Sequence, residues 1–376
     1  MHPLWAVLVS LVLPVSAAAQ DILVESEQAD FTIETVADGL EFPWSIAFLP
    51  DGNMLVSERA GRLRVISPDG LRDDAVNGLP DDLIATNQGG LLGLALHPDF
   101  ETNRLVYFAY ASGTEAANHT ALARGRLNED LTTLSDVEKL FEVNFDKARG
   151  FHFGGRVHFL PDTTLVLTTG DGGLYRQEAQ NLDTHLGTLI RLNDDGTVPF
   201  DNPYVSSRGA QPEIYSYGHR NMQGLDVHPV TGRIWTHEHG PRGGDEINIE
   251  EAAVNYGWPE VSYGENYDQS PVADARRGPQ YREPVWYWVP SVAPSGMSFY
   301  EGDAFPEWQG DLFVGALAGT MLLRYELNGE AIMSEEALLR ELGWRIRDVQ
   351  TGPDGLIYLL TDSDNGRVLR LVPVTN

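Results

Sequence analysis

Cysteine is absent from the 376-residue sequence, which excludes disulfide bonds, thiolate metal ligands and cysteine nucleophiles. Basic residues are also scarce: 26 Lys and Arg stand against 55 Asp and Glu, for a formal net charge of −29. The acidic residues are dispersed and form no tail, which is typical of a solvated, strongly charged surface. Proteins bind nucleic acid largely because their Lys and Arg side chains replace the counterions of its phosphates, and this chain has few such side chains. We therefore expect no nucleic-acid partner.

Long apolar runs are missing except at the N-terminus. Residues 4–20, LWAVLVSLVLPVSAAAQ, have the length of a signal peptide and end in small residues that fit a cleavage site before Gln20. The run is short for a membrane span and Pro14 interrupts it. We predict a signal peptide over residues 1–19, a periplasmic or secreted protein, and a single catalytic domain over residues 20–376. The segment before the apolar run lacks Lys and Arg, so an uncleaved anchor is the alternative.

Helical periodicity is rare, and SEEALLRELG (334–343) is one of few helix candidates. Instead, one hairpin pattern recurs six times: an apolar strand, a turn rich in Pro, Asp or Gly, and a second strand. The copies occupy residues 44–58, 91–110, 154–171, 221–238, 295–317 and 346–362. The pattern predicts an all-β fold, a six-bladed β-propeller of four-stranded antiparallel blades. A pair of β-sandwiches is the competing arrangement, but it would not explain six copies of one hairpin.

Five polar, Gly-rich segments interrupt this pattern beside the predicted inner strands, where loops of a scaffold carry chemistry. They are NQGGLLG (87–93), FHFGGRVHF (151–159), TTGDGG (168–173), YGHRNMQG (217–224) and EHGPRGGDE (238–246). Their His152, Asp171 and Arg220 are the residue types needed to abstract a proton beside a developing negative charge. Each also fits a structural role in a turn or on the surface. The absence of a Gly-x-Ser-x-Gly elbow and of Rossmann and P-loop motifs disfavours serine-hydrolase and nicotinamide chemistry.

Residues 236–249, THEHGPRGGDEINI, contain candidate metal ligands. Zinc is disfavoured, because His237 and His239 are two residues apart in a predicted strand and no His-Glu-x-x-His helix is present. Oxygen donors suit calcium better. They are the backbone carbonyls at the Gly-Pro turn and the carboxylates of Asp245 and Glu246.

From about residue 30 to the C-terminus, the chain resembles the soluble quinoprotein sugar dehydrogenases, in particular the aldose sugar dehydrogenase branch. The motifs that carry the resemblance are PWSIAFLPDG, NQGGLLGLALHPDF, H-x-x-G-R, GDGG, LGTLIRLNDDGTVPFDNP, GHRN-x-QG, GP-x-x-x-DEIN, NYGWP, VPSVAPSG and WRIRDV. The resemblance implies a six-bladed propeller that uses pyrroloquinoline quinone (PQQ) and calcium. It further implies that the protein oxidises aldoses at the anomeric carbon to lactones.

The resemblance also implies residue roles. His152 matches the general base, Asp171 the acid that orients it, and Arg220 the residue beside the quinone oxygen that becomes anionic. The implied PQQ contacts are His152, Arg220, Gln88, Asn221, Arg345 and Arg347, and the last two are expected on one face of a strand. Gly240 and Pro241 match carbonyl ligands of the calcium that holds PQQ, whereas Glu246 and the Tyr256 backbone match a structural calcium site. His237 and His239 are then strand residues and not ligands.

The sequence departs from the glucose-oxidising branch at residues 315–323, where a cofactor-contacting lysine is absent. We therefore expect weaker PQQ binding. The expected partners are an aldose and an electron acceptor, either a quinone or a soluble cytochrome, for a monomer or dimer. A non-redox propeller that binds carbohydrate or protein and keeps calcium for stability is the alternative function. Calcium-dependent lactone hydrolysis is a third. The joint presence of His, Asp and Arg favours the dehydrogenase.

Overall fold

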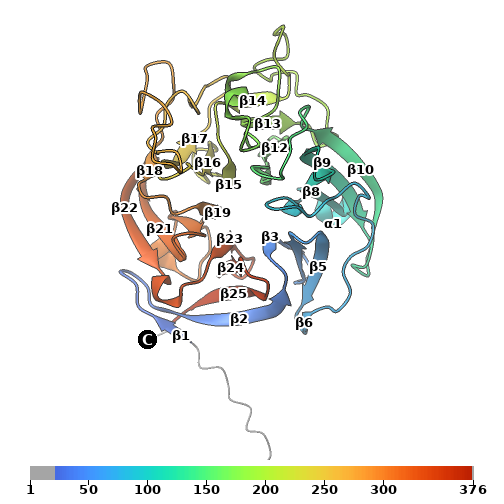
Figure 1. The fold of residues 1–376 in the computed structure, drawn as a ribbon. Coiled ribbons are helices and arrows are strands. Elements are labelled where there is room, and N and C mark those ends of the chain that lie inside the picture. The colour runs from blue at the N-terminus through green and yellow to red at the C-terminus, as the bar shows by residue number, and fades with distance from the viewer. Residues whose placement is uncertain (1–21, 375–376) are drawn as a thin grey trace, which may run out of the picture.

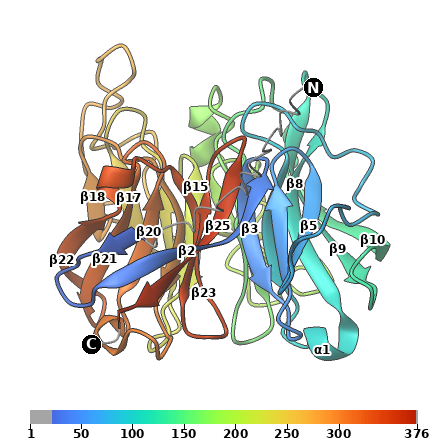
Figure 2. The same cartoon turned by 90° about the horizontal axis from the view of Figure 1, so that it is seen from below.

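The computed structural model describes residues 22–374. In these residues, six antiparallel sheets are arranged as blades around a central axis, as Figure 1 shows from one face and Figure 2 from the side. The predicted six-bladed β-propeller is confirmed. The predicted signal peptide lies outside the described residues. Between residues 22 and 374, no helix combines the length and apolar character needed to span a membrane.

Each blade is numbered here from its inner strand outward. The blades are β3 (Pro43–Phe48), β4 (Met54–Glu58), β5 (Arg62–Ser67) and β6 (Gly70–Leu71); β7 (Leu91–Leu96), β8 (Leu105–Gly113), β9 (Asn118–Leu127) and β10 (Leu134–Glu142); β11 (Val157–Phe159), β12 (Leu165–Thr168), β13 (Thr188–Leu192) and β14 (Ile214–Tyr217); β15 (Met222–Val227), β16 (Ile234–Glu238), β17 (Asp245–Ile249) and β18 (Trp286–Trp288); β19 (Pro294–Phe299), β20 (Leu312–Ala316), β21 (Met321–Asn328) and β22 (Ala331–Leu338); and β23 (Ile346–Thr351), β24 (Ile357–Thr361), β25 (Gly366–Pro373), β2 (Phe31–Leu40) and β1 (Ile22–Val24).

The sixth sheet has five strands because both ends of the described chain contribute to it. Strand β2 pairs with β25 from Phe31 opposite Pro373 to Leu40 opposite Gly366. Figures 1 and 2 show β2 beside β25 at the edge of this blade. The pairing joins the beginning and the end of the propeller and so closes the ring, which leaves no open blade at the junction.

All six predicted hairpins are the innermost strand pairs of the blades, for example β3 with β4 and β23 with β24. The predicted helix at residues 334–343 is wrong. Residues up to Leu338 belong to β22, the outer strand of the fifth blade, and a short 3-10 turn (Arg340–Leu342) follows. Pairing with β21 satisfies one edge of β22, so tertiary context overrides the helix propensity of Ala, Glu and Leu. The only α-helix of the described residues is α1 (Phe100–Asn103).

Apolar side chains fill the spaces between adjacent blades. Leu55 and Val65 of the first blade, for instance, pack with Leu91 and Phe108 of the second. Backbone hydrogen bonds within the blades and side-chain packing between them fix the inner strands around the axis. The segments that precede the inner strands and those that follow the second strands therefore gather at one face, where the polar Gly-rich segments lie.

Candidate active site

A cavity of about 260 Å³ lies at the axis on this face and receives residues from all six blades. Its lining consists of Trp44, Arg59, Gln88, Phe153, Gly154, Asn221, Gln223, His239, Ala293, Leu317, Arg345 and Arg347. The list contains Gln88, Asn221, Arg345 and Arg347, four residues that the sequence singles out for cofactor contact. The fold thus brings together residues that are up to 259 positions apart in the chain.

His152 and Asp171 form a close pair beside this cavity. The Nδ1 atom of His152 lies 2.6 Å from Oδ1 of Asp171, which is almost wholly buried. Burial alone would raise the pKa of Asp171, but the hydrogen bond and charge of His152, the charge of Arg220 and the Gly173 amide bring it below its ordinary value. The carboxylate is therefore ionised and accepts a hydrogen bond from an N–H of the ring. This arrangement places the hydrogen on Nδ1 and leaves the lone pair on Nε2.

The surroundings also keep the His152 ring neutral. Burial is the main cause that lowers the pKa of His152, and the charges of Arg220 and Lys147 lower it further, against the opposing effect of Asp171. A neutral imidazole whose Nε2 lone pair is free can accept a proton at neutral pH. The pair therefore has the electrostatics of a general base and its orienting acid.

The backbone of His152 adopts an unusual conformation. Its φ of 47° lies in the left-handed region, which costs energy for a residue with a side chain. The amide of His152 donates to Oε1 of Gln88 at 2.9 Å, and its carbonyl oxygen approaches Gly170 so closely that a Cβ there would lie 2.3 Å away. Glycine at position 170 thus permits the approach of the loop that carries the base.

The Arg220 guanidinium lies in the wall between the pair and the Gly-Pro turn. It is 7% exposed, and Nη1 donates to the carbonyl oxygens of His239 and Gly240 at 3.0 and 2.9 Å. Both acceptors are neutral, so these contacts form no ion pair that would neutralise the positive charge of Arg220. The charge is then available to stabilise an anion next to it.

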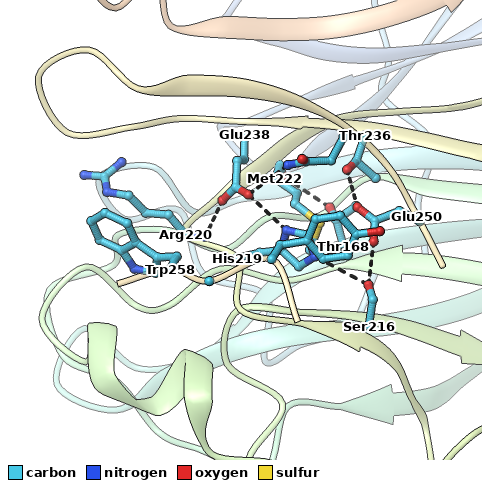
Figure 3. Close-up of polar contacts among 12 residues, drawn as sticks. Thr168, Ser216, His219, Arg220, Met222, Thr236, Glu238, Glu250 and Trp258 are labelled. Atoms are coloured by element: carbon cyan, nitrogen blue, oxygen red, sulfur yellow. Dashed lines mark hydrogen bonds and ion pairs between the residues drawn. The ribbon is translucent and has the colours of Figure 1, made fainter. Parts of the chain in front are cut away.

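A buried polar cluster fixes the backbone of Arg220, as Figure 3 shows. The Arg220 amide donates to Oε2 of Glu238, whose Oε1 lies 2.9 Å from Nδ1 of His219. The Nε2 atom of His219 faces Glu250 at 3.5 Å. Burial lowers the pKa of His219, but the charges of Glu250 and Glu238 outweigh it and raise the pKa to about 10. A buried imidazolium between two carboxylates therefore anchors the segment that carries Arg220.

Three guanidinium groups face a single carboxylate at the opposite side of the cavity. Arg345 donates to Oδ2 of Asp362 from Nε and Nη2 at 3.1 and 2.8 Å, and Arg347 donates from Nη2 to Oδ1 at 3.3 Å. Arg59 lies near the same carboxylate, with its guanidinium over the Phe42 ring. The positive charge exceeds the negative charge in this group. In addition, the buried Nε of Arg347 has no hydrogen-bond partner in the described residues.

The prediction that Arg345 and Arg347 share a strand is wrong in part. Strand β23 begins at Ile346, so Arg345 precedes it and its side chain is 47% exposed, whereas Arg347 lies within the strand and is buried. Both still converge on Asp362. The difference gives Arg345 the outer and Arg347 the inner position in the cavity.

Gly240 and Pro241 are buried at the turn after β16. Asp245, considered as a calcium ligand from its position in the sequence, has another role. Its carboxylate accepts from the Gly240 amide at 2.7 Å and from the amides of Val292 and Ala293 at 2.8 Å each. Asp245 therefore holds the Gly-Pro turn in place. The carbonyl oxygens of the turn are the groups left for a cation, and that of Gly240 also accepts from Arg220.

Glu246 lies opposite Glu238 in the pairing of β17 with β16. Burial and the nearby Glu238 charge raise the pKa of Glu246 well above its ordinary value. Beside them, the Oδ1 atom of Asn248 is buried without a hydrogen-bond partner in the described residues. The Tyr256 hydroxyl donates to the Ile249 carbonyl at 2.6 Å, so its backbone oxygen is the group available to a ligand. Two facing carboxylates and an unpaired oxygen form a donor set of the kind that suits a hard cation.

Residues 22–374 contain no cluster of three or more His, Cys, Asp or Glu side chains that could bind a metal. Any calcium site here therefore depends on backbone carbonyls as well as carboxylates. His237 lies in β16, as expected for a strand residue. His239, also expected to be a strand residue and not a ligand, follows β16 directly and lines the cavity, with its Nε2 2.6 Å from the Pro294 carbonyl oxygen. Burial lowers its pKa to about 3, so it is neutral.

The sequence reasoning also missed Arg59, Trp258 and Asp362. Arg59 and Asp362 share one feature of the sequence with other residues of the site. Each follows the second strand of its blade by one to three residues, as Asp171, His239 and Leu317 do. In five of the six blades, this position therefore holds a residue of the site or its wall. Trp258 lies in the long connection between β17 and β18, and its signal was the NYGWP motif, of which only Tyr256 was considered.

The chain is similar in sequence and fold to known sugar dehydrogenases. The family model described as glucose/sorbosone dehydrogenase matches residues 40–370. The aldose sugar dehydrogenase YliI of Escherichia coli is 41% identical over 92% of this chain and 94% of its own. A crystal structure of a glucose dehydrogenase is 44% identical, with a TM-score of 0.89 over 92% of this chain and all of its own. The PQQ-bound aldose sugar dehydrogenase of Streptomyces coelicolor is 28% identical, with a TM-score of 0.75 over 93% of this chain and all of its own.

Proposed function

Because the chain belongs to the glucose/sorbosone dehydrogenase family, we propose that it oxidises aldose sugars at the anomeric carbon to lactones with PQQ and calcium. The membership confirms the family resemblance of the sequence motifs, and with it an oxidoreductase. The observation that carries the proposed chemistry is the His152–Asp171 pair next to a cationic cavity.

The cavity fits an anionic cofactor. PQQ carries three carboxylates, and planar guanidinium groups bind carboxylates through paired hydrogen bonds. Arg59, Arg345 and Arg347 would bind them, and the unpaired Nε of Arg347 offers a buried donor that lacks an acceptor. Gln88 and Asn221, which also line the cavity, would contribute amide groups. A third arginine, Arg59, supplies positive charge in a chain that lacks the family's cofactor-contacting lysine.

Calcium fits two places. The carbonyl oxygens of Gly240 and Pro241 would hold an ion at the edge of the cavity, and Glu246 with the Tyr256 carbonyl would hold a structural ion. The orphaned oxygen of Asn248 and the opposed carboxylates of Glu238 and Glu246 support the second site, because a divalent cation relieves their repulsion.

The residues of the chain then have separate roles in the reaction. Oxidation of the anomeric C–OH removes a proton from oxygen and a hydride from carbon, and C=O forms. Nε2 of His152 takes the proton, Asp171 stabilises the resulting imidazolium, and Arg220 stabilises the negative charge that develops nearby. When bound, PQQ accepts the hydride and its two electrons, and calcium polarises it as a Lewis acid. The electrons leave to a quinone or a soluble cytochrome.

The proposed place of this reaction is the periplasm or the exterior. The support is the apolar N-terminal run, which has the length and the small terminal residues of a signal peptide. Mass spectrometry of the protein recovered from an exporting host tests this directly. An N-terminus at Gln20 is expected, and a retained Met1 would contradict export with cleavage.

The function is tested by reconstitution of the apoprotein with calcium and PQQ, followed by addition of an aldose and a dye acceptor. Dye reduction that requires both additions, with one lactone formed per two electrons, is expected. If PQQ binds but no aldose reduces the dye, the protein would instead be a propeller that binds ligands without redox chemistry. Lactone consumption without electron transfer would indicate hydrolysis instead.

A further inference from the structure

We propose that Trp258 is a positioning residue that ties the proton-accepting pair to Arg220, an inference that rests on the proposed function. Its indole contacts both halves of the site: the carboxylate that orients the base and the cation beside the developing anion. Trp258 stands in the NYGWP motif, but the roles implied by the resemblance assign only Tyr256 of that motif to the site. Its role follows from its position between two groups of opposite charge.

The contact with Asp171 is a charge-assisted hydrogen bond. Nε1 of Trp258 donates to Oδ2 of Asp171 at 2.8 Å, while Oδ1 of the same carboxylate faces His152. Both oxygens of the carboxylate thus have a partner, which fixes the rotation of the carboxylate and the aim of Oδ1 at Nδ1. Indole N–H is a donor only, so this bond also favours the ionised form of Asp171.

The contact with Arg220 is a cation–π contact. The guanidinium carbon of Arg220 lies 5.4 Å from the centre of the Trp258 ring, and Figure 3 shows the two side chains beside each other. The charges of Arg220 and Asp171 influence each other, yet both guanidinium hydrogen bonds go to carbonyl oxygens. The indole therefore offers each group a partner of its own. Without it, the buried carboxylate and the guanidinium would be drawn into a direct ion pair, away from the substrate.

Two hydrogen bonds hold the backbone of Trp258. The amide of Trp258 donates to the Gly218 carbonyl at 2.8 Å, and Nε2 of Gln180 donates to the Trp258 carbonyl at 2.7 Å. Gly218 belongs to the segment that leads directly into Arg220. The side chain is 8% exposed. Trp258 is thus fixed to the segment of Arg220, and its hydrogen bond to Asp171 links the position of this segment to that of the carboxylate.

Removal of the N–H donor therefore has a specific consequence. Oδ2 of Asp171 becomes a buried anionic oxygen without a hydrogen-bond donor, which is unfavourable. The charged groups that face His152 are Asp171, Arg220 and Lys147. If Asp171 turns from the ring toward Arg220, His152 loses its orienting acceptor, and the Nδ1–H form of the ring is no longer favoured.

The test compares Trp258→Phe, which keeps a ring over Arg220 but removes the N–H, with Trp344→Phe as the control. Trp344 also lies under a guanidinium, that of Arg367, at 4.2 Å. Single-turnover cofactor reduction by glucose should fall roughly tenfold or more in Trp258→Phe, the scale of 1.4 kcal/mol. The Kd for PQQ and the KM for glucose should stay within about twofold. Wild-type rates are expected in the control.

A spectroscopic measurement on the apoprotein needs no cofactor. The ring ¹⁵N shifts of His152 should show the Nδ1–H form in the wild type and a lower population of it in Trp258→Phe. If that variant fails to fold, 3-benzothienylalanine at position 258 keeps the shape and replaces N–H by sulfur. Unchanged rate and unchanged ¹⁵N shifts in a folded variant would overturn the inference. Absence of cofactor reduction in the wild type would instead refute the proposed function, and the ¹⁵N shifts would still decide whether Trp258 positions Asp171.

Discussion

The 2.6 Å contact between Nδ1 of His152 and Oδ1 of Asp171 determines which ring nitrogen can act as the base. The carboxylate is buried and ionised, so the ring must present N–H to it and keep the lone pair on the other side. The left-handed backbone of His152 and the close approach of its carbonyl oxygen to Gly170 fix the loop that carries the ring.

The first prediction concerns the pH dependence of kcat/KM. The rate should fall as pH falls through the pKa of His152, because the protonated ring cannot accept a proton. Burial and the Arg220 charge lower this pKa, so the fall should lie below pH 6.5, the ordinary value for histidine. Since Asp171 opposes this lowering, Asp171→Asn should move the fall to still lower pH and reduce the plateau rate. A fall centred above pH 6.5 in the wild type would contradict the burial of the base.

The second prediction concerns cofactor affinity. Replacement of Arg59, Arg345 or Arg347 by Ala should weaken PQQ binding by roughly ten- to a hundredfold, the effect of about 1.5–3 kcal/mol for a hydrogen bond to a charged group. The rate at saturating PQQ should change much less. A titration of the apoprotein followed by protein fluorescence measures the Kd without turnover. Arg367→Ala, which removes a guanidinium that lies over Trp344, serves as the control. Unshifted Kd values in all three variants would exclude the carboxylates of PQQ from this cavity wall.

The fold could be predicted because its signal is local and repeated. Each of the six hairpins carries its turn chemistry and alternating apolar residues within about 20 residues, so the blade count follows from the sequence. The helix predicted at 334–343 failed for the opposite reason. The backbone partners of that segment lie in β21, and pairing with another strand cannot be read from composition.

The site could be predicted only where a motif marked it. His152, Asp171 and Arg220 stand in distinctive Gly-rich segments, and the structure brings them to one face. Arg59 and Trp258 were missed because their partners are distant in the chain: Asp362 is 303 residues from Arg59, and Asp171 is 87 from Trp258. Position after a second strand explains Arg59 once the blades are aligned. Trp258 belongs to the NYGWP motif, but the motif alone does not show that the β17–β18 connection brings the indole to Asp171.

The third prediction concerns the buried Lys147, one of the chain's two lysines. Its side chain is almost wholly buried, with Nζ 2.9 Å from the centre of the Phe153 ring and 3.0 Å from Oδ1 of Asn118. Desolvation lowers its pKa from 10.5 to about 6. Between these values the unfolded chain holds a proton that the folded chain has lost, so stability rises with pH. The cost of burying the charged ammonium group of Lys147 therefore applies in full below about pH 6 and disappears by about pH 10.5.

Lys147→Met should therefore raise Tm by roughly 2–4 °C or more at neutral pH, the scale of 1 kcal/mol in a protein of this size. The gain should grow toward pH 6 and shrink toward pH 10. Lys139→Met is the control, because Lys139 is partly exposed and paired with Asp82 and Glu142. Calorimetry of both variants from pH 5 to 10 decides the matter. A lower Tm for Lys147→Met at every pH would show that its hydrogen bond outweighs the buried charge.

The fourth prediction concerns calcium. An ion that binds only the folded chain adds RT ln(1 + [L]/Kd) to stability, about 2.7 kcal/mol at a hundredfold excess over Kd. Calcium should therefore raise Tm and a chelator should lower it. Glu246→Gln should weaken this dependence, whereas Glu260→Gln, at an exposed position, should not. Identical melting curves with calcium and with chelator would argue against a structural ion at Glu246.

The most direct test of the account is single-turnover reduction of PQQ in the calcium-loaded protein, with glucose that carries either hydrogen or deuterium at C1. We predict that the PQQ spectrum changes to the reduced form and that deuterium slows this change, because the C1–H bond breaks in that step. In His152→Ala the same change should be about 10²-fold slower or more, with PQQ still bound. His158→Ala, a partly exposed histidine of β11, should match the wild type. Reduction that is as fast in His152→Ala as in the wild type, or no reduction by glucose or any other aldose, would contradict the account.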